Sequence, residues 1–287
     1  MPNKNSKTEF RIPKTVFAKK SFGQNFLFDQ NYVNKIISAL NPQPHETIVE
    51  IGAGRGALTE RLIESGENIV AVEIEREMIA VLRDKFAGKE NFRLIESDAL
   101  KIDYSRFRIP DSGFQIKLVA NLPYYISTRI LQKLIRQRAS FSEMILMFQR
   151  EVVERMTAKV GSSKRGFLTV LSEAYLEIEK LFDVPPDAFR PAPKVWSSVV
   201  RLITKKSDEI TFENEDLFRE MISAAFRQKR KTLWNNLKDF KFKNQIEKKG
   251  RNEIFLLSEI SPQTRAENLT ISEWKKLFTT YAKISAK

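Results

Sequence analysis

Short apolar runs alternate with amphipathic stretches between residues 28 and 150 of this chain. The apolar runs predict buried strands at Thr47–Ile51, Asn68–Glu73, Phe92–Glu96, Gln115–Ala120 and Met144–Phe148. The intervening stretches repeat apolar residues three and four positions apart, which predicts helices. The first predicted helix is capped by Asp29. The others are Ala57–Ser65, Glu77–Phe86 and Ser127–Arg138, the last with Ser127 as its cap. The alternation predicts an α/β fold with a mostly parallel sheet covered by helices on both faces.

The pattern changes in the second half of the chain. After a predicted helix at Gly166–Tyr175, the runs Leu176–Val184 and Ser197–Ile203 predict two antiparallel edge strands. Beyond about Thr204 only helical patterns recur, at Leu217–Phe226, Lys229–Leu237, from Ile246 onward and at Ser272–Tyr281. We therefore predict a basic mobile arm at residues 1–20, an α/β domain at 21–204 and a small all-helical domain at 205–287.

The composition narrows the chemistry. The 287 residues include no cysteine and a single histidine, His45, in a polar stretch between prolines and glutamate. Thiolate metal sites and cysteine nucleophiles are excluded, and histidine triads and zinc sites are strongly disfavoured, so we expect no metal. The net charge of +13 favours a polyanionic partner such as nucleic acid. The chain shows no secretory signal and no membrane-length apolar run, which is typical of a cytoplasmic protein without a membrane partner.

A glycine-rich turn follows the first predicted strand. Gly52, Gly54 and Gly56 have the spacing G-x-G-x-G and open a predicted helix, where a ligand can approach the backbone closely. Glu73 ends the second strand, 21 residues after Gly52, where a carboxylate can accept both hydroxyls of a ribose. Asp98 follows the third strand, within reach of the amino group of an adenine. Ligands of open α/β sheets bind at these carboxyl ends, so the sequence predicts a nucleoside-containing cofactor there.

A second motif, Asn121-Leu122-Pro123-Tyr124, ends the fourth predicted strand. The Asn121 amide oxygen and the Leu122 carbonyl can accept the two N–H bonds of an exocyclic amine. Tyr124 can stack on a flat ring, and Pro123 stiffens the loop. The motif therefore predicts chemistry on the amino group of a base, with the second face of that base stacked on Phe189. The plainer interpretation of Phe189 is a core phenylalanine that anchors the proline-rich loop.

Four segments together resemble a known family, the ribosomal RNA adenine N6-dimethyltransferases. They are Gly23–Leu27, Glu50–Gly56, Asn121–Tyr124 and Phe189–Ser197. Ala225–Leu233 and Arg265–Leu269 resemble the small-subunit branch of the family more than the Erm branch, which modifies the large subunit. The resemblance runs from about Lys19 to Leu269 and implies a Rossmann-like class I methyltransferase sheet with a small helical domain.

The resemblance also implies a cofactor, a substrate and site residues. S-adenosyl-L-methionine would be the methyl donor, and two adjacent adenosines near the 3′ end of small-subunit (16S) ribosomal RNA would each receive two methyl groups. Transferred position by position, the donor site comprises Asn25, Leu27, Gly52, Gly54, Glu73, Asp98 and Asn121. Catalysis would fall to Asn121, Leu122, Pro123, Tyr124 and Phe189. We expect a monomer that acts on a pre-ribosomal particle and takes part in small-subunit biogenesis.

Basic residues gather in the predicted helical domain. Between Ala225 and Arg251 only Asp239 and Glu247 oppose a series of lysines and arginines. A charge run is often a solvated helix face, but its density and the net charge favour phosphate contact. The candidate RNA-binding residues are Arg227, Lys229, Arg230 and Lys231, with Lys164 and Arg165 in a second loop. Trp234 falls on the apolar side of the predicted helix and is expected in the core.

Three other functions remain open from the sequence. An Erm-type enzyme would share the cofactor residues and the Asn121 loop, and only the C-terminal segments argue against it. A DNA adenine or glutamine methyltransferase would leave the Asn25 segment and the Phe189 loop unexplained. A non-catalytic assembly or transcription factor of the same fold would not need Gly52, Glu73, Asp98 and Asn121 intact.

Overall fold

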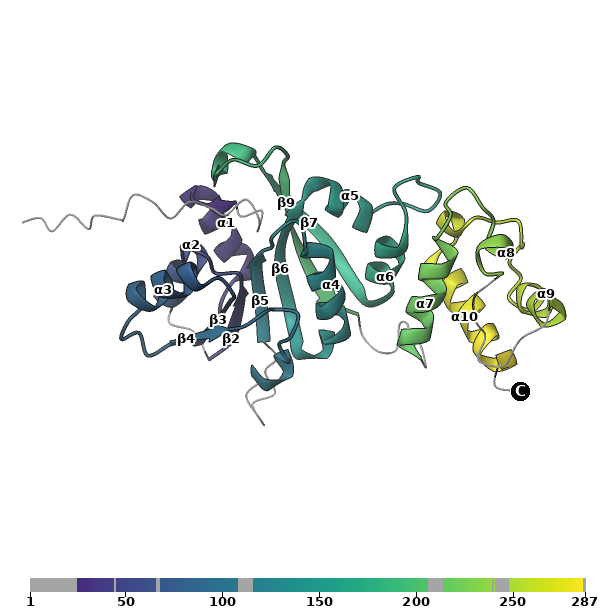
Figure 1. The fold of residues 1–287 in the computed structure, drawn as a ribbon, viewed down its shortest axis with the longest axis horizontal. Helices are drawn as coiled ribbons and strands as arrows, with labels where there is room; N and C mark the ends of the chain where they lie inside the picture. Colours follow the sequence, from purple (N-terminus) through teal and green to yellow (C-terminus); the bar gives the residue numbers. More distant parts are fainter. Residues whose placement is uncertain are drawn as a thin grey trace, which may run out of the picture.

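A computed structural model describes residues 25–43, 45–65, 68–107, 116–205, 214–238, 240 and 248–285. The molecule is elongated, with a sheet-containing part at one end and a group of helices at the other (Figure 1). The predicted arm at residues 1–20 lies outside the described residues, so the prediction made for it stays open. Among the described residues, short 3₁₀ helices occur at Tyr104–Phe107, Arg138–Ser140, Pro186–Ala188 and Ala266–Asn268.

The main sheet has the strand order β4-β3-β2-β5-β6-β9-β7. Its parallel strands are β2 (Thr47–Ile51), β3 (Asn68–Glu73), β4 (Phe92–Glu96), β5 (Ile116–Asn121) and β6 (Phe141–Gln149). The predicted parallel α/β fold is therefore confirmed. Strands β7 (Leu176–Val184) and β9 (Ser197–Thr204) are antiparallel, as predicted. Only β7 lies at an edge, however, because β9 inserts between β6 and β7.

Both faces of the sheet are buried, because successive side chains of each strand enter different cores. On β5, Leu118 and Ala120 join one core while Val119 joins the other. The first core is covered by α4 (Ser127–Arg136), α5 (Arg150–Met156) and α6 (Phe167–Tyr175), and the second by α1 (Gln30–Leu40), α2 (Ala57–Glu64) and α3 (Arg76–Lys85). Asp29 caps α1 as predicted, with its carboxylate accepting from Asn31 N at 2.8 Å. Ser127 is not the cap of α4; it is the first helical residue, after Ile126.

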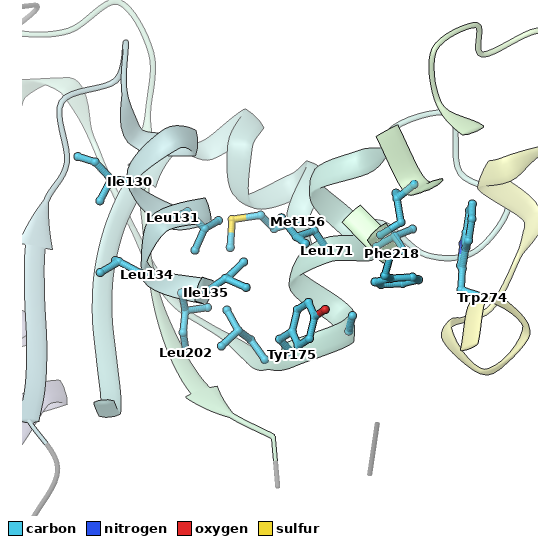
Figure 2. Packing of buried hydrophobic residues seen from close by; sticks show 14 of the residues in the cluster. Ile130, Leu131, Leu134, Ile135, Met156, Leu171, Tyr175, Leu202, Phe218 and Trp274 are labelled. Atoms are coloured by element: carbon cyan, nitrogen blue, oxygen red, sulfur yellow. The ribbon is translucent and has the colours of Figure 1, made fainter. Parts of the chain in front are cut away.

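The described residues beyond Lys205 contain helices and no strand, as predicted. The helices are α7 (Glu215–Ala225), α8 (Leu233–Asn236), α9 (Lys248–Leu257) and α10 (Ile271–Ser285). The predicted helix at residues 229–237 is wrong in its first half, where the chain forms turns before α8 begins. Figure 2 shows how Phe218 of α7 and Trp274 of α10 continue the core of α4 and α6, so the helices and the sheet share one hydrophobic cluster.

A second, two-stranded sheet joins segments far apart in the sequence. Strand β1 (Phe26–Leu27) pairs antiparallel with β8 (Phe189–Arg190). Phe28 N and Asp29 N both donate to the carbonyl of Ala188, at 3.1 and 3.4 Å. The proline-rich loop thus holds the Asn25 segment against the main sheet.

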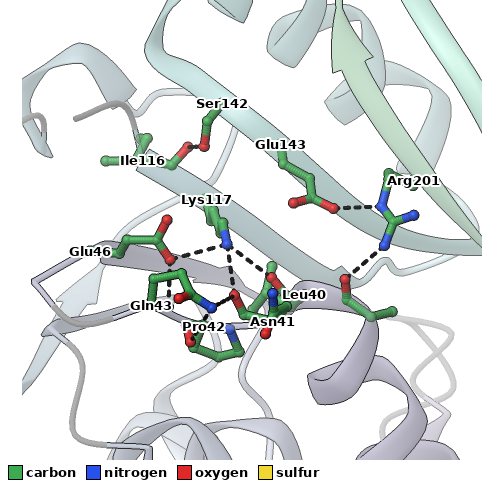
Figure 3. Close-up of polar contacts among 11 residues, drawn as sticks. Leu40, Asn41, Pro42, Gln43, Glu46, Ile116, Lys117, Ser142, Glu143 and Arg201 are labelled. Atoms are coloured by element: carbon green, nitrogen blue, oxygen red, sulfur yellow. Dashed lines mark hydrogen bonds and ion pairs between the residues drawn. The ribbon is translucent and has the colours of Figure 1, made fainter. Parts of the chain in front are cut away.

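The start of β5 is fixed by a buried lysine (Figure 3). Lys117 Nζ donates to the carbonyls of Leu40 and Asn41, at 3.1 and 2.8 Å, and lies 3.1 Å from Glu46 Oε2. The carbonyls belong to the C-terminal end of α1, where a cation is favoured. These contacts anchor the strand whose other end carries Asn121.

Candidate active site

A pocket of about 340 Å³ opens at the carboxyl ends of the parallel strands. It lies where the strand order reverses between β2 and β5, the position at which open α/β sheets bind ligands. Its volume falls in the range of about 300–1,000 Å³ for small-molecule sites. The predicted residues that line it are Asn25, Leu27, Gly52, Gly54, Glu73, Asp98, Asn121, Leu122, Pro123 and Tyr124.

The glycine-rich turn shapes the wall of the pocket after β2. Gly54 has φ +55°, a left-handed conformation that glycine adopts without steric cost. A Cβ added there would lie 3.1 Å from the ring of Phe26, so the absence of a side chain lets the Asn25 segment pack against the turn. The Arg55 guanidinium stacks over the same ring at 4.9 Å.

Glu73 holds the turn and faces the pocket at the end of β3. Its Oε2 accepts from Gly54 N at 2.9 Å, and its Oε1 accepts from Ile74 N and Glu75 N at 2.8 and 3.0 Å. A carboxylate has about four acceptor positions, so one remains for a ligand hydroxyl, where the sequence predicted that Glu73 accepts two. The residue thus positions the glycine-rich turn as well as offering an acceptor, which the sequence did not indicate.

Asp98 and two apolar side chains form the next part of the wall. Asp98 Oδ1 accepts from Leu100 N at 2.9 Å. Ile74, 57% exposed, and Leu100 line the pocket beside it. An acceptor between apolar side chains suits a flat base with an amino group at its edge. The sequence prediction missed Ile74. Because Ile74 directly follows Glu73, which ends β3, the sequence could have placed it in the pocket wall.

Asn121 is oriented by a contact from the opposite side of the pocket. Its Nδ2 donates to the carbonyl of Asn25 at 3.1 Å. A carbonyl only accepts, so this bond assigns the amide nitrogen to that side and leaves Oδ1 as the acceptor for a ligand. Leu122 is buried, and its N–H donates to Met147 O at 3.4 Å, which fixes the backbone of the loop.

Tyr124 is half-buried and anchored at both ends. Its Oη lies 2.6 Å from Ser197 Oγ, and its carbonyl accepts from Ser127 Oγ at 3.2 Å. Burial raises the pKa of Tyr124, against the opposing effect of the Ser197 hydrogen bond, so the phenol stays neutral near pH 7. Tyr125, 55% exposed, also lines the pocket. The sequence prediction did not single it out, although a second aromatic residue adjoins the motif.

Phe189 is a correction to the sequence prediction. Its side chain is 0% exposed and belongs to the core with Leu27, Val184 and Val199. It does not line the pocket, because β8 turns it inward when it pairs with β1. The stacking role is therefore wrong for this structure. Phe189 anchors the proline-rich loop, the plainer of the two interpretations.

Arg165 is a second correction. Its side chain is 2% exposed, with Nη2 3.0 Å from Leu269 O and 2.7 Å from Glu173 Oε2. Nη1 donates to Ala158 O at 3.2 Å. These contacts hold both terminal nitrogens of the buried guanidinium within the protein, so Arg165 does not form part of an RNA surface. The neighbouring Lys164 is exposed.

The other predicted RNA-binding residues are exposed on the turns before α8: Arg227, Lys229, Arg230 and Lys231. Lys229 Nζ donates to Ser163 O at 3.1 Å, so this basic turn adjoins the loop that carries Lys164. The turn is built around Asn236, which is 7% exposed and donates to Ala225 O and Gln228 O at 2.7 and 3.0 Å. The sequence prediction missed Asn236, since only the fold shows that its amide closes the turn.

Glu50 is a buried carboxyl group in the pocket wall. Burial raises the pKa of Glu50 to about 7, with a further contribution from the charge of Glu73 and an opposing one from Thr59. Thr59 Oγ1 donates to Glu50 Oε2 at 2.6 Å. Near neutral pH the Glu50 carboxyl group is therefore partly protonated although it lies in the pocket wall.

Neither a metal-ligand cluster nor a membrane-spanning helix occurs in the part of the chain that the structure describes. No group of three or more His, Cys, Asp or Glu side chains could hold a metal ion there. Among the same residues, no helix is both long enough and apolar enough to span a membrane.

The sheet and pocket define a class of protein. A glycine-rich turn, a carboxylate at the end of the next strand and an acceptor beside apolar side chains fit the amino acid, ribose and adenine parts of S-adenosylmethionine. The site is that of a Rossmann-like, S-adenosylmethionine-dependent methyltransferase. The model of the ribosomal RNA adenine dimethylase family matches residues 16–283. The chain belongs to that family, so it is an enzyme that methylates adenine in ribosomal RNA.

Similar proteins agree with this assignment. "Ribosomal RNA small subunit methyltransferase A" of Nitrosospira multiformis is 42% identical over 256 residues, covering 89% of this chain and 93% of the relative. The protein of the same name from Hahella chejuensis is 38% identical over 260 residues, 91% of each chain. The crystal structure of a dimethyladenosine transferase from Plasmodium falciparum has a TM-score of 0.75 at 30% identity, covering 90% of this chain and 98% of that one.

The likeness to the other branch is weaker. The crystal structure of the 23S rRNA methyltransferase ErmE has a TM-score of 0.63 at 20% identity, covering 90% of this chain and all of that one. At that identity the comparison shows the common fold alone. The prediction that the chain resembles the small-subunit branch is confirmed by its relatives.

Proposed function

We propose that this protein transfers methyl groups from S-adenosylmethionine to the N6 amino groups of two adjacent adenosines near the 3′ end of small-subunit ribosomal RNA. The observation that carries the proposal is the position of Asn121 and Tyr124 in the cofactor pocket, in a chain whose relatives bear a small-subunit name. An amide and an aromatic ring beside the donor suit an adenine amino group.

The amino nitrogen of adenine is a weak nucleophile, because its lone pair is delocalised into the ring. In the proposed reaction Asn121 Oδ1 and the Leu122 carbonyl accept its two N–H bonds. This holds the nitrogen with its lone pair turned toward the pocket, and the same dipoles stabilise the positive charge that develops on it. Bound S-adenosylmethionine would supply a methyl group already activated by a sulfonium, so that the N–C bond forms as the S–C bond breaks. The amino nitrogen then loses one proton to water. Alignment of the amino nitrogen with the methyl group then supplies most of the acceleration of methyl transfer, without a histidine or a general-base carboxylate.

The target base must leave its stack, at a cost of a few kcal/mol. Tyr124 offsets that cost on one face of the base, since stacking on an aromatic ring is worth about 1–3 kcal/mol per base. The anchoring of its hydroxyl by Ser197 keeps the ring in one orientation. With Phe189 in the core, Tyr125 is the exposed aromatic side chain of the pocket that we assign to the entering base.

Phosphate contact falls to the exposed basic residues. We assign residues 21–204 to cofactor and base binding, and residues 205–287 to RNA binding, with Lys164 of the first part joining Arg227, Lys229, Arg230 and Lys231 of the second. RNA is recognised largely by shape and by splayed bases, which a folded particle presents better than a bare strand. We therefore propose a pre-ribosomal particle as substrate, a monomeric enzyme without metal, a role in small-subunit biogenesis and a cytoplasmic location.

Labelled methyl transfer tests this function. Purified protein and S-adenosylmethionine are incubated with small subunits that lack the modification, with large subunits and with the bare small-subunit RNA. The products are then mapped by mass spectrometry. The proposal predicts N6,N6-dimethyladenosine at two adjacent positions near the 3′ end, with the particle the better substrate. Transfer to large subunits alone would show an Erm-type specificity instead.

A further inference from the structure

An exposed tryptophan lies beside the wall of the pocket. Trp196 is 43% exposed and directly precedes β9. The next residue, Ser197, is buried, and its Oγ is 2.6 Å from the hydroxyl of the pocket residue Tyr124. Because consecutive Cα atoms are about 3.8 Å apart, the backbone of Trp196 lies one residue from the side chain that anchors Tyr124. The indole does not line the pocket itself.

The tryptophan is held in place by the start of α5. Arg150 N donates to Trp196 O at 2.9 Å, and the Arg150 guanidinium lies 5.9 Å from the centroid of the indole ring. The first contact fixes the backbone, and the second is a cation–π interaction. Trp196 is therefore a preorganised surface with a cation against its ring.

The surroundings of Trp196 favour an anionic strand. Two cations near it are exposed: Arg150, which lies against its ring, and Lys194, two residues before it in the chain. The acids around it are paired with cations. On α5, Glu154 lies 2.6 Å from Lys164 Nζ and 3.7 Å from Arg150 Nε, and Glu151 lies 4.0 Å from Arg155 Nε. Asp183 lies 2.8 Å from Lys180 Nζ. An exposed aromatic ring beside basic side chains is an arrangement that binds single-stranded nucleic acid through base stacking and phosphate contact.

Contacts also connect this surface with the basic turn before α8. Arg150 and Glu154 lie on one helix, Glu154 pairs with Lys164, and the loop of Lys164 accepts from Lys229 Nζ through Ser163 O. Three exposed cations, Arg150, Lys164 and Lys229, are thus linked between Trp196 and the turn before α8, with the paired carboxylate of Glu154 between the first two.

We propose that Trp196 stacks on the nucleotide adjoining the adenosine in the pocket, and that Arg150 contacts the phosphate between the two. This inference rests on the proposed function and adds a second base-binding position to it. The pair of adjacent adenosines then has two places on the enzyme, one in the pocket and one on Trp196. The strand continues from Trp196 along α5 toward Lys229.

A thermodynamic cycle between protein and RNA tests the stacking. Small subunits are reconstituted with a synthetic 3′ segment carrying one target adenosine, flanked by a normal nucleotide, by an abasic 5′ neighbour or by an abasic 3′ neighbour. Wild type and Trp196→Ala are compared by kcat/KM for methyl transfer on each substrate. On the intact substrate, Trp196→Ala should lower kcat/KM about tenfold, the effect of one lost stacking contact. For one of the two abasic substrates, the kcat/KM of wild type should fall by a similar factor relative to the intact substrate. The kcat/KM of Trp196→Ala should be the same on that abasic substrate as on the intact one.

The controls separate stacking from folding and from the function itself. Trp196→Phe keeps an aromatic ring and should retain most of the activity, whereas Val195→Ala removes a neighbouring exposed apolar side chain and should stay within about twofold of wild type. If wild type transfers methyl groups but an abasic neighbour on either side changes its kcat/KM by the same factor as that of Trp196→Ala, the inference is wrong and the function stands. A surface for a protein partner would give that result. If wild type transfers to no small subunit, the proposed function itself fails.

Discussion

Asn121 is the residue on which the chemistry depends. The hydrogen bond from its Nδ2 to Asn25 O gives the amide a single orientation before any ligand binds. Because Asn25 lies next to β1, which is paired with β8, this orientation is set by a segment about a hundred residues away in the sequence. A preorganised acceptor does not have to reorient when charge develops on the base.

Asn121→Ala should lower methyl transfer by about 10²–10³-fold, the loss found when one preorganised polar group is removed from an active site. Binding of S-adenosylmethionine should stay within about tenfold, because the glycine-rich turn, Glu73 and Asp98 remain. Single-turnover rates and calorimetric titration measure the two effects. Asn91→Ala, which removes an amide bonded to Ile63 O, is the control for folding. Near-normal turnover by Asn121→Ala would contradict the mechanism.

Glu50 should make stability depend on pH. Its pKa is about 7 in the folded protein because of burial, against an ordinary value of 4.5. Between those values the folded chain keeps a proton that the unfolded chain has lost, so the free energy of unfolding falls as the pH rises. Glu50→Gln should flatten that decline, since Gln still accepts from Thr59 and carries no charge. Urea unfolding from pH 4.5 to 7.5 measures both slopes; equal slopes would contradict this account.

At the scale of elements, the sequence predicted the parallel strands closely and the small sheet not at all. Strands β2, β3 and β4 have the predicted bounds, because each is an apolar run ended by a polar or turn residue. Strands β1 and β8 have two residues each, too few for any periodicity. Their pairing buries Phe189, which is why its predicted stacking role was wrong. Arg165 was misassigned for a similar reason, since only the packed C-terminal helices show that its charge is enclosed.

The turn from β2 into α2 gives a prediction about one element. Gly56 caps α2 with φ +77°, and a Cβ there would lie 2.7 Å from Phe86 Cε2. Gly88 has φ +74° and nothing within 4 Å of the added Cβ. Gly56→Ala should therefore lose about 1–3 kcal/mol more stability than Gly88→Ala, since only the first adds a clash to the backbone cost. Urea unfolding compares the two variants, and equal losses would show that the turn relaxes around the methyl group.

At the scale of the molecule, the sheet and the C-terminal helices form one packed unit. Figure 2 shows the core running from Ile130 on α4 to Trp274 on α10. Arg165 joins the two parts through Leu269 O and Glu173. The basic turn before α8 is thereby held at a fixed distance from the pocket, which a shape-based recognition of RNA requires.

Arg165→Met should lower the free energy of unfolding by about 3 kcal/mol, because it leaves the carbonyl of Leu269 and part of Glu173 buried without a partner. Lys164→Met removes the same charge one residue earlier at an exposed position. It should change stability by no more than about 0.5 kcal/mol but weaken RNA binding. Chemical unfolding and filter binding separate the two effects. A fully stable Arg165→Met variant would show that the guanidinium does not join the two parts.

The most direct test of the central claim is a crystal structure of the protein with S-adenosylmethionine or its non-reactive analogue sinefungin and an adenosine in the pocket. We expect the adenine ring against Tyr124, its exocyclic nitrogen within hydrogen-bond distance of Asn121 Oδ1, and Asn121 Nδ2 still bonded to Asn25 O. An Asn121 side chain turned away from the donor, with the base held elsewhere, would contradict the account.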